Sequence, residues 1–72
     1  MNATQMIELM NRTPFEPIEI HLNDGTQILV EHPYYIATRP KGSMCFIYDE
    51  DERIRYVAYR NIAQVVTKAT AQ

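Results

Sequence analysis

The sequence is poor in the residues on which disulfides, zinc sites and phosphate-binding loops depend. Its 72 residues include one cysteine, two histidines and two glycines. Cys45 alone cannot form an internal disulfide, and no Cys/His cluster has the spacing of a structural zinc site. Two glycines are too few for a glycine-rich phosphate loop. The sequence therefore predicts no metal ion and no cofactor.

Long apolar runs and an excess of positive charge are also missing. No apolar stretch is long enough for a transmembrane helix, and residues 1–5 lack the basic and apolar regions of a signal peptide. We therefore expect a cytoplasmic protein with no membrane partner. Seven basic and nine acidic residues leave a net charge of −2, whereas a nucleic-acid-binding protein usually has a basic balance or a basic face.

A chain this short forms a single domain, residues 1–72, with a small core. Such a domain buries a smaller share of its surface than a mid-sized one does. Small proteins usually gain further stability from disulfides, a metal ion or a partner subunit. Because the sequence predicts neither of the first two, it favours oligomerisation.

The clearest structural signal is a β-hairpin between residues 17 and 33. Apolar residues stand at every second position of its first half, as in a half-buried strand. Asn23-Asp24-Gly25 supplies residues that tolerate positive φ in a tight turn. We predict strands over residues 17–23 and 26–31, with Leu29 on the face away from the core.

A helix is predicted before the hairpin, over residues 3–12. Asn2 and Gln5 suit a capping box at its start. A helix of this length is not stable alone in water, so its apolar stripe around Met6 must dock on another element. Packing against the sheet is favoured over a surface for a partner helix. Phe15, between two prolines, is expected to anchor the connector in the core.

Further strands are predicted over residues 35–39, 44–48, 53–59 and 64–67, followed by a frayed tail over 68–72. Apolar side chains point to both sides of residues 44–48, which is typical of a central strand covered on both faces. The predicted fold class is mainly β with one N-terminal helix. Short strands joined by tight turns favour a small five-stranded, partly open barrel of the SH3-like or Sm-like kind.

The sequence indicates no catalytic set, and we predict that the protein is not an enzyme. No serine, histidine and carboxylate constellation is apparent. Cys45 lies in an apolar strand, whereas a nucleophilic cysteine needs accessible, electropositive surroundings. The acidic run at residues 49–52 lacks the spacing of an EF-hand, so we interpret it as a solvated turn balanced by Arg53 and Arg55.

Tyrosines and basic residues supply the candidate interaction or RNA-contact residues. Tyr34 and Tyr35 are expected at a corner of the chain, near a basic turn that carries Arg39 and Lys41. Tyrosines beside arginines are typical of single-stranded nucleic-acid recognition, and tyrosine is also enriched at protein interfaces. The negative net charge favours core and interface roles for these tyrosines.

Most of the chain resembles a set of short, uncharacterised bacterial proteins. These begin with a helix and continue with an Arg/Thr-Pro-Phe-x-Pro-hydrophobic motif, a strand, Asp-Gly, a second strand and His-Pro. The corresponding motifs here are residues 13–18, Asp24-Gly25 and His32-Pro33, and the resemblance spans about residues 5–67. It implies a family but no activity.

The chain also resembles Sm-like proteins of the Hfq type, which have an N-terminal helix and a bent five-stranded barrel. Residues 59–66, Tyr-Arg-Asn-Ile-Ala-Gln-Val-Val, are similar to the second Sm signature, where a short turn links the last two strands. That turn lies near the RNA-binding pore of a ring, which implies RNA contacts for Tyr59, Arg60 and Asn61. The first Sm signature is not evident between Gly25 and Tyr48.

Two functional hypotheses follow. The first is a small non-enzymatic β-barrel protein that acts as a homo-oligomer or through contact with a protein partner. The second is an Sm-like RNA-binding module.

Overall fold

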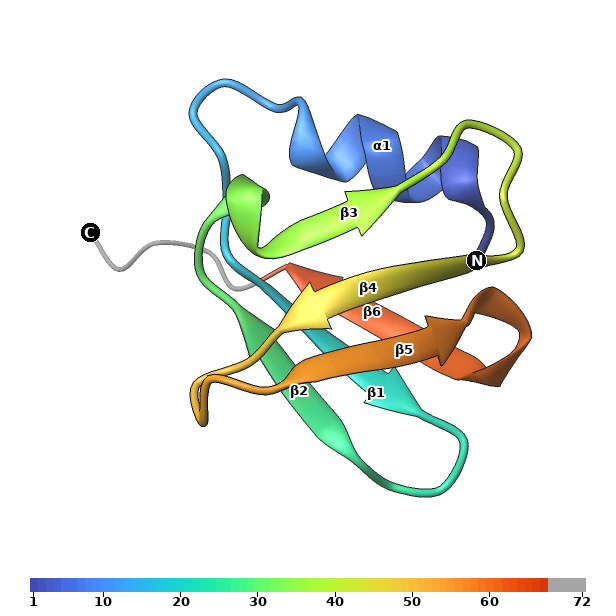
Figure 1. Cartoon of the computed structure of the whole chain (residues 1–72). Helices are drawn as coiled ribbons and strands as arrows, with labels where there is room; N and C mark the ends of the chain where they lie inside the picture. The colour runs from blue at the N-terminus through green and yellow to red at the C-terminus, as the bar shows by residue number, and fades with distance from the viewer. Residues whose placement is uncertain (68–72) are drawn as a thin grey trace.

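The computed structural model describes residues 1–67 and shows a mainly β protein with one short N-terminal helix (Figure 1). The predicted tail, residues 68–72, lies outside the described residues. The elements are α1 (Ala3–Met10), β1 (Ile18–Leu22), β2 (Gln27–Val30), the 3-10 turn η1 (Pro33–Tyr35), β3 (Ile36–Thr38), β4 (Met44–Tyr48), β5 (Ile54–Ala58), the 3-10 turn η2 (Tyr59–Asn61) and β6 (Ile62–Thr67). The predicted fold class is therefore confirmed at this level.

The six strands form two antiparallel sheets of three strands each, in the orders β2-β1-β6 and β3-β4-β5. Figure 1 shows the second sheet crossing in front of the first. The chain changes sheet at η1 and again at η2. Pro33, which has no N–H to donate to a ladder, opens the 3-10 turn η1 that separates β2 from β3. The described strands do not close into a barrel, so the predicted five-stranded barrel is not confirmed.

The predicted hairpin is present and its register places one row of side chains in the core. Ile18 lies opposite Val30, and Ile20 lies opposite Ile28. Gly25 has a φ of 93°, in the left-handed region that favours glycine. Strand β1 also pairs with β6, so the hairpin's first strand is the centre of its sheet.

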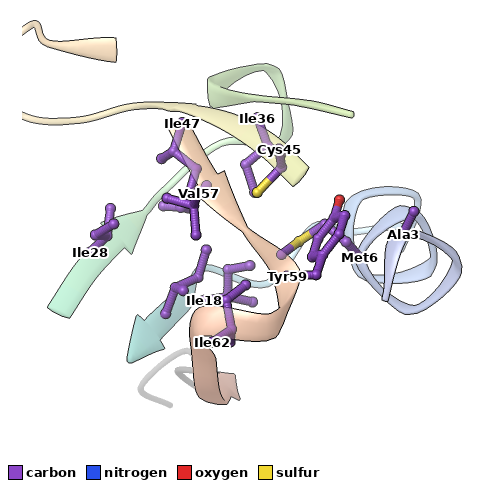
Figure 2. Close-up of a cluster of buried hydrophobic side chains, with 12 residues drawn as sticks. Ala3, Met6, Ile18, Ile28, Ile36, Cys45, Ile47, Val57, Tyr59 and Ile62 are labelled. Atoms are coloured by element: carbon purple, nitrogen blue, oxygen red, sulfur yellow. The ribbon is translucent and has the colours of Figure 1, made fainter. Parts of the chain in front are cut away.

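The core lies between the two sheets and is closed at one end by α1 (Figure 2). Both sheets contribute residues that are completely buried, including Ile18, Ile20 and Ile47. Helix α1 contributes Met6, also completely buried, and Ala3. The predicted capping box is confirmed, because Asn2 accepts a hydrogen bond from the Gln5 backbone N–H and Gln5 accepts one from that of Asn2. Docking against the sheets therefore explains the apolar stripe of α1.

Strand β4 corrects one prediction. It is the central strand of its sheet, but only one of its faces is covered. Cys45 and Ile47 point into the core, whereas Met44, Phe46 and Tyr48 are exposed. The other sheet and α1 lie on the inner side, so within residues 1–67 no element covers the outer side.

Candidate interaction surface

The side of the β3–β4–β5 sheet that faces away from the core is unusually apolar. Strand register brings its residues together: Phe46 lies opposite Tyr56, and Tyr48 lies opposite Ile54. Tyr56 is 71% exposed and Ile54 is 61% exposed. We call this surface the outer face, and its residues are Ala37, Met44, Phe46, Tyr48, Ile54 and Tyr56.

Aromatic contacts extend the outer face to the corner at η1. The rings of Phe46 and Tyr56 have centroids 4.9 Å apart. Tyr48 contacts Tyr35 edge-on at 5.7 Å, and Tyr35 contacts Tyr34 at 5.2 Å. These packed rings have already lost part of their rotamer freedom, so a partner that binds them has less side-chain entropy to overcome.

Two depressions shape the outer face. The larger, of about 450 Å³, lies beside the turn between β3 and β4 and is lined by residues that include Arg39, Met44 and Phe46. The smaller, of about 230 Å³, lies between η1 and the pair Tyr48 and Ile54. The surface therefore has hollows that can receive side chains of a partner.

Turns of opposite charge stand at the two ends of β4. The turn before it carries Arg39 and Lys41, both exposed, and we call residues 39–43 the basic turn. The turn after it, residues 49–52, is acidic at every position, and we call it the acidic turn. The outer face is therefore flanked by positive charge at one end and by negative charge at the other.

Within the acidic turn, Asp49 is committed to structure. It accepts hydrogen bonds from Arg55 Nε at 2.6 Å and from the backbone N–H of Arg53 at 3.0 Å. Arg55 and the backbone N–H groups of Arg53 and Asp51 lower the pKa of Asp49, because their hydrogen bonds stabilise the carboxylate. Glu50, Asp51 and Glu52 form no ion pair within residues 1–67, so their charges face solvent.

The structure separates the candidate residues that the sequence grouped at one corner. Tyr34 and Tyr35 lie in η1, immediately before β3, whereas Arg39 and Lys41 lie in the turn immediately after it. The two pairs therefore stand at opposite ends of the outer face. The expected proximity is not found, because β3 runs between them as an extended strand.

The structure divides the residues of the second Sm-like segment in a similar way. Tyr59 is only 4% exposed, and its hydroxyl shares a hydrogen bond with that of Thr38. Burial raises the pKa of this phenol. The Tyr59 ring lies in the core beside Met6 and Cys45 (Figure 2), where it cannot stack on a base.

The other two residues of that segment are accessible. Arg60 and Asn61 are exposed in η2. The Tyr59 backbone N–H donates to the Ser43 carbonyl at 3.0 Å, which places η2 against the basic turn. Arg60 therefore lies at the same end of the outer face as Arg39 and Lys41.

The histidines and the cysteine contact neighbouring side chains or are buried. His21 Nε2 lies 2.9 Å from Glu19 Oε1, and the ring of His32 stacks on Tyr34. Cys45 is buried, and burial raises the pKa of its thiol, which opposes the reactive thiolate form. In the part of the chain that the structure describes, no three His, Cys, Asp or Glu side chains gather in a way that could hold a metal ion.

Sequence reasoning missed the outer face as a site, although a signal was present. Apolar residues at 44, 46 and 48 and again at 54 and 56 share one face, and β4 has a second apolar set, Cys45 and Ile47, on its opposite face. The two apolar sides of β4 predict a strand that is covered on both faces. The only predicted element left to cover a second face is one short helix, and in residues 1–67 that helix packs against β3.

Comparisons with models of known protein families, with curated proteins and with solved structures find no match. Both resemblances drawn from the sequence therefore stay predictions. No helix in residues 1–67 is long and apolar enough to span a membrane.

Proposed function

We propose that this chain is a small non-enzymatic β protein that acts by self-assembly or by contact with a protein partner, through the outer face. The observation that carries the proposal is the exposure of adjacent large apolar side chains on neighbouring strands. Scattered exposed apolar residues are ordinary in proteins, but contiguous ones mark interaction sites.

The size of the outer face supports this proposal. Large apolar side chains have surfaces on the order of 150–250 Å², so the exposed parts of its five large residues amount to roughly 500 Å². A patch of about 300–600 Å² is the largest that a typical monomer exposes, and such patches are often functional. This one occurs on a chain with a total accessible surface of only 5097 Å².

We propose further that the two sheets are the halves of a partly open barrel of the SH3-like or Sm-like kind. Two features support this view: β2 and β3 follow one another through η1 into different sheets, and β6 returns to pair with β1. In such an arrangement each sheet covers the inner face of the other, and the outer faces are available for contacts.

RNA binding is the second candidate function. It is favoured by the position of Arg39, Lys41 and Arg60 at one end of an aromatic surface, since single-strand recognition combines cations with stacking rings. The buried ring of Tyr59 and the acidic turn at the other end oppose it. We therefore place protein–protein contact first.

Light scattering and native mass spectrometry over a range of protein concentrations test the proposal. The wild-type protein is expected to associate, and Tyr56→Lys is expected to weaken association by at least about tenfold, because it places an unpaired charge in the apolar contact. Gln64→Lys is the matched control, since it adds the same charge at an exposed position outside the outer face.

A wild-type protein that stays monomeric at millimolar concentration would contradict self-assembly and leave only contact with a different protein. Equal association of wild type and Tyr56→Lys would show that the protein does not associate through the outer face. Salt-dependent binding of a single-stranded RNA to a monomeric protein, weakened by Arg60→Ala, would favour the second function instead.

A further inference from the structure

The two ends of the outer face carry opposite charge, and this arrangement indicates which partner covers it. Strand β4 runs along its middle from the basic turn to the acidic turn, over about 17 Å for five extended residues. Phe46 is the central residue of β4, with Met44 toward the positive end and Tyr48 toward the negative end. A surface that is apolar in the middle and oppositely charged at its ends is complementary to a reversed copy of itself.

We infer that the outer face is covered by a second copy of this chain, packed face to face about a two-fold axis. The axis lies between the β3–β4–β5 sheets of the two copies and crosses β4 near Phe46 at close to a right angle. This inference rests on the proposed function and names the partner that the proposed function leaves open. In a two-fold interface the same surface serves both subunits, so the outer face must complement itself.

Charge selects this axis over its alternative. A two-fold axis at a right angle to β4 reverses the strand, so that the basic turn of each copy lies opposite the acidic turn of the other. An axis along β4 would instead bring basic turn to basic turn and acidic turn to acidic turn. The first arrangement pairs Arg39 and Lys41 with Glu50 and Asp51 twice over, and the second is repulsive at both ends.

The apolar part of the contact fits the same arrangement. Reversal about Phe46 brings Tyr48 of each copy over Met44 of the other, beside the groove of about 450 Å³ that Met44 and Phe46 line. Sheets that pack face to face lie about 10 Å apart, at an angle of about −30°, which leaves room for half-buried rings to interdigitate. The five large residues of the outer face are between 37% and 71% exposed.

The area is sufficient for a specific dimer. Two outer faces of roughly 500 Å² each remove about 1,000 Å² of apolar surface, and the two pairs of charged turns add a polar rim. A biological interface is expected to bury at least about 1,000 Å² in total and has an apolar centre with a polar rim.

A pair of charge reversals tests the arrangement. One variant carries Arg39→Glu and Lys41→Glu, and the other carries Glu50→Lys and Asp51→Lys; all four side chains are exposed. Each variant alone is expected to dimerise at least about tenfold more weakly than wild type, because its changed turns face like charges. An equimolar mixture is expected to recover dimers near the wild-type strength, since both contacts of the mixed dimer again join opposite charges.

Sedimentation velocity measures the populations, and native mass spectrometry separates mixed from single-variant dimers. Glu8→Lys, a charge reversal on α1, is the control and is expected to leave the dissociation constant unchanged.

The outcomes separate this inference from the proposed function. Association of wild type that is lost in Tyr56→Lys but unchanged in both charge variants would overturn the inference and leave the proposed function standing. A trimer or larger ring formed through the outer face would do the same. A wild-type protein that does not associate would contradict the inference and the self-assembly part of the proposed function. Recovery in the mixture also shows that each variant is folded, so loss of dimer in the single variants cannot be assigned to unfolding.

Discussion

At the scale of single residues, two tyrosines on either side of one sheet have opposite roles. Tyr59 fills the gap between β4 and α1, and its hydroxyl shares a hydrogen bond with Thr38. Tyr56 stands on the outer face with 71% of its surface exposed. The two tyrosines are close together in sequence, so composition alone does not assign their roles. The register of β5 places Tyr56 on the outer face, and η2 turns Tyr59 into the core.

Removing each hydroxyl in turn tests this assignment. Tyr59→Phe is expected to lower the free energy of unfolding by about 1 kcal/mol at neutral pH, because it loses a buried hydrogen bond. The loss is limited because the Thr38 hydroxyl also lies 3.4 Å from the Met44 carbonyl oxygen and keeps that acceptor. Tyr56→Phe, the matched control, is expected to change the free energy by less than about 0.5 kcal/mol. Urea unfolding measures both.

The pH dependence gives a second readout for Tyr59. Its folded pKa is raised above the unfolded value of about 10. The neutral phenol therefore stabilises the fold fully below the unfolded pKa, and this contribution is lost as pH rises through the folded pKa. Wild type is expected to lose more stability in alkali than Tyr59→Phe does. Equal alkaline losses in the two proteins would show that the phenol is not buried as described.

At the scale of elements, local patterns predicted the strands and the helix cap well, but they did not predict which strand faces are covered by other elements. The alternation in β1 and the Asn-Asp-Gly turn fixed the hairpin, and Asn2 with Gln5 fixed the start of α1. Each of these patterns spans only a few neighbouring residues, so it can be recognised in a single sequence. Whether a strand face is covered depends on the placement of distant elements, which is why the open side of β4 was missed. For the same reason the sequence did not predict that Tyr34 and Arg39, which are close in the chain, lie at opposite ends of β3.

Helix α1 provides the prediction at this scale. Met6 is completely buried against the sheets, so Met6→Ala is expected to lower the free energy of unfolding by about 2–5 kcal/mol. Glu8→Ala, on the exposed side of the same helix, is expected to change it by less than about 0.5 kcal/mol. Thermal and urea unfolding should be compared at one protein concentration, because association stabilises the folded state. A loss below about 1 kcal/mol for Met6→Ala would contradict the docked position of α1.

At the scale of the whole molecule, small size and an open apolar sheet face have a common explanation. A chain of 72 residues has a core that rarely supplies more than about 3–5 kcal/mol. A second copy on the outer face would bury further apolar surface without lengthening the chain. The single cysteine and the lack of a Cys/His cluster predict that neither a disulfide nor a metal ion adds stability, and the sequence favours oligomerisation on that ground. It could not indicate which surface associates, because that depends on the register of β4 with its two neighbours.

The central claim is that the outer face is the surface through which the protein associates. A dilution series followed by nuclear magnetic resonance tests it most directly, because each resonance reports on its own residue. We expect the signals of Phe46, Ile54 and Tyr56 to shift together as concentration falls, with one dissociation constant, while those of α1 and the exposed edge of β6 stay fixed. Shifts confined to α1 or β6, or no shift up to millimolar concentration, would contradict the claim.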